Sequence, residues 1–116
     1  MKVIPLDKLE KMPVDMDGAK NLFKQVPISD KDGSPMFCFR VFTVEPEGHT
    51  PYHTHPFEHL NYVIEGTGAM VTESGEEKPL KKGDFAIVLP DEKHCYKNVS
   101  ENQPFVMICA VPKAYE

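Results

Sequence analysis

The chain has 116 residues, which is enough for one domain with a modest hydrophobic core. Hydrophobic residues make up 41% of it and charged residues 27%, so the composition is that of an ordinary globular protein. The net charge of −5 argues against nucleic-acid binding as its main task. No stretch approaches the roughly 20 apolar residues that a membrane-spanning helix needs.

The N-terminus and the cysteines indicate the cellular compartment. The first residues, MKVIPLDKLEKMPV, lack the continuous apolar core of a secretion signal. Cys38, Cys95 and Cys109 are an odd number of cysteines without a CxxC spacing, and they predict buried free thiols rather than a disulfide framework. We therefore expect a cytoplasmic protein.

The secondary structure is predicted to be almost entirely β. Only residues 6–12 favour a short helix, and eleven prolines spread along the chain argue against long ones. The rest consists of short apolar runs, several of which alternate with the period of two that is typical of strands. The predicted strands are residues 22–28, 36–44, 60–65, 69–72, 77–80, 85–89, 94–99 and 105–111. Strands at this spacing predict a β-sandwich or a β-barrel.

Turn residues separate these strands. Asp32-Gly33 is a tight-turn signal, and Pro46-Glu47-Gly48 predicts a turn after the second predicted strand. Lys82-Gly83-Asp84 and the segment from Pro90 to Lys93 predict two more turns. The chain has no internal repeat and no linker, so we expect all strands to belong to one domain.

Three of the five histidines lie within the segment HTHPFEH, which begins at His53. Residues i and i+2 of a strand share a face, so His53 and His55 can converge on one metal ion at about 2.0–2.1 Å. Pro56-Phe57 then turns the chain, and His59 opens the next strand, from which it can reach the same ion. The spacing therefore predicts a metal site built from these three histidines.

The two remaining histidines differ in their predicted roles. His94 begins a strand directly after a turn, which makes it the candidate for a fourth ligand, whereas His49 lies in a loop and is expected to be exposed. Holding several imidazoles uncharged in an apolar pocket is costly without a partner, which favours a metal over simple packing. Metal binding is expected to weaken below about pH 6.5, where free imidazole takes up a proton.

The segment HPFEH, residues 55–59, also matches the HxxEH pattern of certain metalloproteases. That interpretation requires a helix with both histidines on one face and Glu58 as the general base. The following residues are β-branched or aromatic and stop at Gly66, and His53 and His94 would have no role. We therefore expect Glu58 to be an exposed turn residue or a hydrogen-bond partner of a ligand histidine.

Together, the two histidine sites resemble the motifs of the cupin superfamily. The first cupin motif contains HxH, then a glutamate after three or four residues, then a glycine after six more. Here His53 and His55 form the HxH, His59 stands where many cupins have the glutamate, and Gly66 follows at the expected distance. Glu47 occupies the place of the motif's first glycine.

The second cupin motif matches over its histidine and asparagine. Gly83 begins it, Leu89 replaces its proline, and Asp91 stands at its second glycine. His94 and Asn98 occupy the histidine and asparagine positions. Aspartate tolerates the left-handed backbone region better than most residues, so the exchange at position 91 is physically mild.

The likeness is to small, single-domain, four-histidine cupins, and it implies both the fold and the metal. It implies a jelly-roll β-barrel (a double-stranded β-helix) over residues 31–116. Residues 1–30 would form an N-terminal segment whose strands pair two copies in a homodimer. The implied ligands of one divalent transition metal ion, which can be Mn, Fe, Zn, Ni or Cu, are His53, His55, His59 and His94.

The same resemblance assigns the inward faces of the strands. Small four-histidine cupins have an arginine at the place of Arg40 and a cysteine near that of Cys109, so these two residues are expected inside, together with Tyr96 and Met107. An inward guanidinium is costly unless it meets an anion, so Arg40 is expected to bind a substrate carboxylate. The alternative is that Arg40 faces solvent on an outer strand.

Four neutral imidazoles leave the full charge of a divalent ion in place and two positions open on a six-coordinate ion. We expect an oxygenase-like enzyme that acts on a small carboxylate, enolic or aromatic compound. The alternatives are a Lewis-acid isomerase or lyase, and a non-catalytic pocket that binds or senses a small ligand. The expected partners are a small molecule and a second copy of the chain, and neither nucleic acid nor membrane.

Overall fold

The computed structural model describes residues 1–115, and nearly all of their regular structure is β-strand. The strands are β1 (Met12–Pro13), β2 (Lys20–Ile28), β3 (Phe37–His49), β4 (His59–Glu65), β5 (Thr67–Thr72), β6 (Glu77–Lys81), β7 (Phe85–Val88), β8 (His94–Asn98) and β9 (Phe105–Pro112). Three single-turn 3-10 helices complete the set: η1 (Leu6–Lys8), η2 (Asp30–Asp32) and η3 (Lys113–Tyr115). No helix within residues 1–115 is long and apolar enough to cross a membrane.

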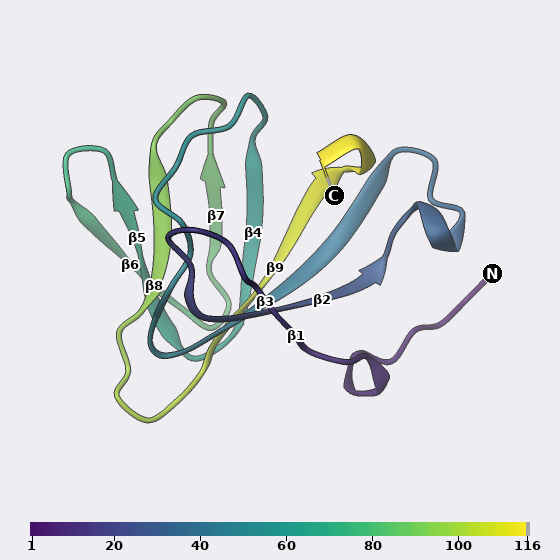
Figure 1. Cartoon of the computed structure of the whole chain (residues 1–116), viewed down its shortest axis with the longest axis horizontal. Coiled ribbons are helices and arrows are strands. Elements are labelled where there is room, and N and C mark those ends of the chain that lie inside the picture. Colours follow the sequence, from purple (N-terminus) through teal and green to yellow (C-terminus); the bar gives the residue numbers. More distant parts are fainter. Residues whose placement is uncertain (116) are drawn as a thin grey trace.

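The strands form a curled antiparallel sheet that builds a jelly-roll β-barrel, as the sequence predicted (Figure 1). The strand order is β6-β5-β8-β3-β9-β4-β7, and β2 also pairs with β3. Within residues 1–115, strand β3 pairs with three other strands. Most of its length pairs with β2 on one side and with β9 on the other, and His49 at its end pairs with Lys97 of β8. In Figure 1, β2 and β3 extend toward the side on which both termini lie.

The alternation predicted for the strands is confirmed and places the core inside the barrel. On β9, Met107 and Cys109 are 1% and 0% exposed, and on β8, His94 and Tyr96 are 3% and 1% exposed. The main hydrophobic cluster consists of Leu22, Val44, Val63, Leu80, Val88, Tyr96, Phe105 and Met107. Polar residues on the same inward faces therefore lie in a largely apolar interior.

The predicted turn at Pro46-Glu47-Gly48 is wrong, because β3 continues through it to His49. Both β3 and its partner β2 are irregular here: Glu47 has φ +66°, Asn21 has φ +48°, and the register between the strands shifts. A Cβ at Gly48 would lie 2.7–2.8 Å from three backbone oxygens, so only glycine fits. The turn residues thus make a bulge that bends a long strand instead of ending it.

The N-terminal segment packs against the barrel. The helix predicted for residues 6–12 is reduced to η1, which is held by Gln25, whose Nε2 donates to the carbonyls of Leu6 (3.0 Å) and Leu9 (2.9 Å). The loop between β1 and β2 lies on the barrel at Pro51, since a Cβ on Gly18 would be only 3.3 Å from Cα of Pro51. This contact brings the loop to the end of the barrel that carries the histidines.

Candidate metal centre

The backbone brings the two histidine motifs together. His53 and His94 exchange two hydrogen bonds, from His53 N to His94 O (3.1 Å) and from His94 N to His53 O (3.0 Å). Residues paired in this way have Cα atoms about 5.5 Å apart. His59 is the first residue of β4, and β3 and β9 lie between β8 and β4 in the sheet order, so His59 approaches the other histidines from another part of the curled sheet.

The four imidazole rings form one cluster. The ring centroid of His55 lies 4.7 Å from that of His59, 4.9 Å from that of His94 and 5.2 Å from that of His53. One ligand nitrogen from each of His53, His55 and His94 lies within 4.8 Å of the other two, which is a group that could hold a metal ion. Two nitrogens bound to one ion at about 2.1 Å lie at most about 4.2 Å apart, so these three need only small movements.

Backbone carbonyls fix the tautomers of His55 and His94. Nδ1 of His55 lies 2.7 Å from the carbonyl oxygen of Phe57, and Nδ1 of His94 lies 2.8 Å from that of Glu92. A carbonyl oxygen only accepts, so each Nδ1 carries the proton and each Nε2 keeps its lone pair. Both Nε2 atoms are buried without a hydrogen-bond partner within residues 1–115. These residues therefore fit a metal ion, which would pair with the two orphaned nitrogens.

His59 has the opposite arrangement. Its Nε2 lies 3.1 Å from Nη2 of Arg40, and because a guanidinium only donates, this Nε2 is the acceptor. Its Nδ1 is the buried ring nitrogen that lacks a partner in the described chain. The structure thus holds the fourth predicted ligand beside the other three, with Arg40 bound to one of its two ring nitrogens.

Burial favours the neutral form of His53, His59 and His94. It is the main cause that lowers the pKa of His59 to about 3, and the positive charge of the nearby Arg40 guanidinium is the second cause. Burial is also the main cause that lowers the pKa values of His53 and His94. Protons therefore compete with a metal for these nitrogens at a lower pH than the value of about 6.5 expected from free imidazole.

A small cavity of about 140 Å³, here called the inner cavity, lies beside the four histidines. Arg40, Tyr96 and Met107 line it, as the sequence predicted for their faces. Cys109 is placed differently: it is fully buried, lies outside the lining found for residues 1–115, and accepts a hydrogen bond from Nη2 of Arg40 (3.3 Å). Arg40 and Cys109 are paired across β3 and β9, so the longer side chain covers the thiol.

Several contacts at the site were not predicted from the sequence. Phe57 stacks on His55 with ring centroids 4.0 Å apart, and the hydroxyl of Tyr96 donates to Oδ1 of Asn61 (2.7 Å). Met16, from the loop between β1 and β2, also lines the inner cavity. Residues i and i+2 of a strand share a face, so the position of Asn61 follows from that of His59, but no local pattern indicates that the distant loop reaches the site.

Two other sequence interpretations are decided by the fold. Residues 56–57 form a bend and His59 begins a strand, so the helix required by the metalloprotease pattern does not exist there. Glu58 is exposed, in agreement with the turn interpretation. His49 was predicted to be an exposed loop residue, but it ends β3, is half-buried, and lies outside the inner cavity.

Comparison with protein families agrees with this geometry. The cupin domain model matches residues 40–111, which include all four clustered histidines and more than half of the chain. The chain therefore belongs to the cupin family. A search of curated proteins finds no match.

Solved structures extend the likeness to nearly the whole chain. The polyketide cyclase RemF from Streptomyces resistomycificus shares 27% sequence identity and has a TM-score of 0.91, over 97% of this chain and 80% of that one. A cupin 2 domain-containing protein from Halorhodospira halophila shares 27% identity with a TM-score of 0.72, over 78% and 62% of the two chains. A predicted oxalate decarboxylase from Thermotoga maritima shares 18% identity with a TM-score of 0.81, over 96% and 99%, which supports the fold alone.

The two positions where the sequence departs from the cupin glycines keep the backbone that glycine favours. Glu47 has φ +66° and Asp91 has φ +68°. Both values lie in the left-handed region, which costs residues with a side chain roughly 1–2 kcal/mol. The fold therefore holds both residues in a conformation that glycine adopts more easily.

Proposed function

We propose that this cupin is a divalent-metal enzyme whose ion is held by His53, His55 and His94, with His59 as the fourth ligand. The observation that carries the proposal is the pair of buried Nε2 atoms of His55 and His94, which lack hydrogen-bond partners while their Nδ1 atoms are fixed on carbonyls. Neutral imidazoles suit Mn, Fe, Zn, Ni or Cu, so the donor set defines the class of metal rather than one element.

His59 and Arg40 link the metal to the substrate. His59 can use Nε2 as a ligand only when the Arg40 guanidinium, now 3.1 Å away, turns from it. A guanidinium displaced within a half-buried site needs a new partner, and a carboxylate or enolate of the substrate supplies two acceptor oxygens. Binding of an anionic substrate therefore favours the four-histidine state.

The chain's own groups prepare the substrate for reaction. A bound divalent ion supplies Lewis acidity that polarises a carbonyl or enol oxygen. Arg40 positions the anionic end, and the Tyr96 hydroxyl, fixed on Asn61, stays protonated because burial raises the pKa of Tyr96. The apolar wall that includes Met107 limits water in the inner cavity.

The reaction class we favour is a Lewis-acid rearrangement or cyclisation of an enolic or aromatic carbonyl compound. The likeness to a polyketide cyclase, at 27% identity over 97% of this chain, supports this class of substrate. The second candidate is oxidation of the same compounds by dioxygen, because a ligand set of neutral imidazoles also suits iron. A protein that only binds such compounds is the remaining alternative.

Metal analysis followed by turnover assays distinguishes these functions. Protein purified without a histidine tag is expected to contain one divalent metal ion per chain, and a chain that takes up none contradicts the proposal. Metal-loaded protein is then incubated with 1,3-dicarbonyl compounds and hydroxylated aromatic acids, with and without dioxygen. Product formed equally under both conditions supports the Lewis-acid reaction, whereas dioxygen consumed in proportion to product supports oxidation. Binding without any product identifies a non-catalytic cupin.

A further inference from the structure

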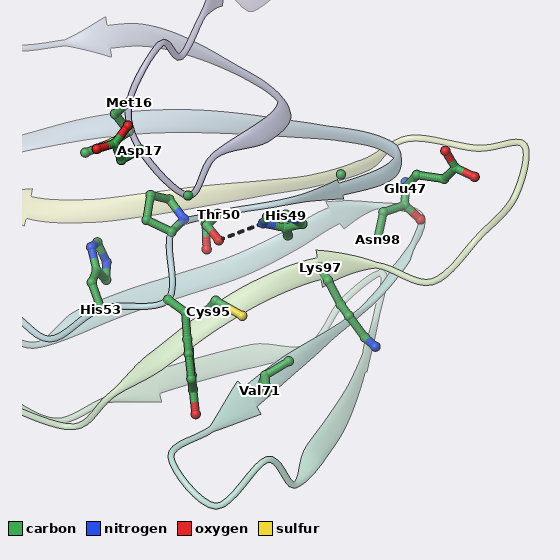
Figure 2. Close-up of a pocket in the computed structure, with 14 residues that line it drawn as sticks. Met16, Asp17, Glu47, His49, Thr50, His53, Val71, Cys95, Lys97 and Asn98 are labelled. Atoms are coloured by element: carbon green, nitrogen blue, oxygen red, sulfur yellow. Dashed lines mark hydrogen bonds between the residues drawn. The ribbon is translucent and has the colours of Figure 1, made fainter.

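A second and larger cavity, here called the outer pocket, lies outside the inner cavity and has a volume of about 850 Å³. Figure 2 shows Met16 and Asp17 on one side of it and Cys95 and Val71 on the other, with His53 at one end. Its walls therefore come from the loop between β1 and β2, from the chain around His53, and from β5 and β8.

The outer pocket and the inner cavity adjoin each other. Met16, Thr50, Pro51 and His53 line both. His53 is also one of the three histidines whose ligand nitrogens cluster, so the outer pocket begins at the candidate metal site. A ligand that spans the two cavities would pass directly beside this histidine.

The two volumes indicate how a ligand divides between the cavities. A cavity of about 150 Å³ holds a single benzene ring, so the inner cavity of about 140 Å³ takes one ring or a group of similar size. Pockets for larger organic ligands measure roughly 300–1,000 Å³, a range that includes the outer pocket. Any substrate larger than one ring must therefore extend into the outer pocket.

We propose that the outer pocket binds the apolar or aromatic body of the substrate while its polar end enters the inner cavity. The part played by the polar end rests on the proposed metal-dependent function. Apolar groups of Met16, Pro51 and Val71 supply contact surface for the body. Met16 determines which substrate bodies fit, because it lines both cavities. Its side chain is flexible, is 54% exposed and lies where the two cavities meet.

The test uses two metal-binding probes that share one polar end. Acetohydroxamate is small enough for the inner cavity alone, and 2-naphthohydroxamate adds a two-ring body. Binding is measured on metal-loaded and metal-free protein, by calorimetry for both probes and by naphthyl fluorescence for the second. The variants Val71→Trp and Met16→Trp fill the outer pocket from opposite walls. Met36→Trp is the control, because Met36 is 64% exposed and lines neither cavity.

On metal-loaded wild-type protein, 2-naphthohydroxamate is expected to bind about tenfold or more tightly than acetohydroxamate, since its rings remove more apolar area from water. Val71→Trp and Met16→Trp are expected to remove this advantage. Val71 lies outside the lining of the inner cavity, so Val71→Trp is expected to leave acetohydroxamate affinity unchanged, whereas Met36→Trp changes the affinity of neither probe. Equal affinity of the two probes for the wild type, or an advantage that survives in both pocket variants, overturns the proposal.

Failure of the metal site is recognised separately. If the protein takes up no metal and does not bind acetohydroxamate, the proposed function is wrong. Naphthyl fluorescence on the metal-free protein then tests the outer pocket by itself. Binding of 2-naphthohydroxamate that Val71→Trp abolishes supports the proposed pocket, and no binding overturns the proposal. Circular dichroism of each variant confirms that the barrel is folded, and Met16→Trp, at an exposed position, provides the result if Val71→Trp does not fold.

Discussion

Nη2 of Arg40 lies 3.1 Å from Nε2 of His59, so a cation contacts a ring nitrogen of the residue predicted as a metal ligand. The same Nη2 donates to Sγ of Cys109 at 3.3 Å, which orients the guanidinium within the barrel. Arg40 is therefore inside the site, as the resemblance to small cupins implied, and not on the outer surface. Its position makes metal binding and anion binding depend on the same side chain.

Removing the Arg40 guanidinium is expected to strengthen metal binding and to weaken anion binding. Arg40→Ala frees Nε2 of His59 and removes a positive charge beside the ion, so metal affinity should rise by about tenfold, the equivalent of one charged hydrogen bond. Benzoate should no longer bind to the metal-loaded variant. Arg40→Lys should not restore benzoate binding fully, because an ammonium lacks the planar fork of the guanidinium.

Isothermal titration with Zn²⁺, and then with benzoate on the metal-loaded protein, measures both effects of the Arg40 substitutions. Lys31→Ala serves as the control, because it removes an exposed positive charge on η2, outside the inner cavity. A loss of metal affinity in Arg40→Ala would show that Arg40 supports the site instead of competing with the ion.

Alanine at His55 or His94 is expected to reduce metal affinity by at least about a hundredfold, because each contributes an unpartnered buried Nε2. Alanine at His53 should have a similar effect, and alanine at His59 a smaller one, because Arg40 competes for its Nε2. Metal content after dialysis against a chelator measures the loss. His49→Ala is the control, and an equal loss in that variant would refute the ligand assignment.

The stability of the metal-free protein should fall as the pH drops from about 6.5 toward 3. Burial holds the pKa of His59 at about 3 in the folded chain, while unfolded histidine protonates near the usual value of 6.5. Between these values the unfolded state binds more protons, so acid favours it, by on the order of a few kcal/mol for this residue. His53 and His94, whose pKa values are also lowered, act in the same direction.

Urea unfolding of the metal-free protein at several pH values across this range measures the acid effect. In His59→Gln the free energy of unfolding should depend less steeply on pH, whereas His49→Gln should behave like the wild type. An unchanged pH dependence in His59→Gln would mean that His59 is not the buried neutral group described here.

Glycine at the two strained positions should stabilise the fold. Glu47 and Asp91 have φ values of +66° and +68°, so Glu47→Gly and Asp91→Gly should each raise the free energy of unfolding by about 1 kcal/mol. Glu101→Gly is the control, because Glu101 is exposed and is not among the residues with positive φ. This variant should lower the free energy of unfolding by about 0.5–1 kcal/mol. Thermal and urea unfolding give the comparison, and destabilisation by both glycine variants would contradict the strain argument.

We further predict a homodimer formed through residues 1–30. Strand β2 is paired with β3 on one side. On its other side, the backbone contacts found within residues 1–115 are the pairing of β1 with Lys24 and Phe23 and a hydrogen bond from Val14 N to Leu22 O, which leaves part of this edge for a second copy. Val3 and Met12 are 94% and 53% exposed and offer apolar contact surface in the same segment. Light scattering at micromolar concentration should give twice the chain mass of 13.1 kDa, and deletion of residues 1–11 should lower it. A monomeric wild-type chain would refute this prediction.

The sequence by itself determined which residues share a strand face and which histidines can meet. Alternation put His94, Tyr96 and Asn98 on one face, and all three are buried. The motif position of Asp91 predicted a left-handed backbone, which its φ of +68° confirms. These features depend on spacing along one strand or turn, where the period of two and the backbone geometry leave few alternatives.

Only the tertiary structure decided which of these groups contact each other. The bulge that carries β3 through Glu47 depends on its pairing with β2, so a turn signal read from the sequence alone gave the wrong result. The contact of Arg40 with His59, the position of Cys109 behind Arg40, and the placement of Met16 at the junction of the two cavities join residues far apart in the chain. Such contacts are set by the curvature of the closed sheet and by side-chain packing between strands, which local periodicity does not encode.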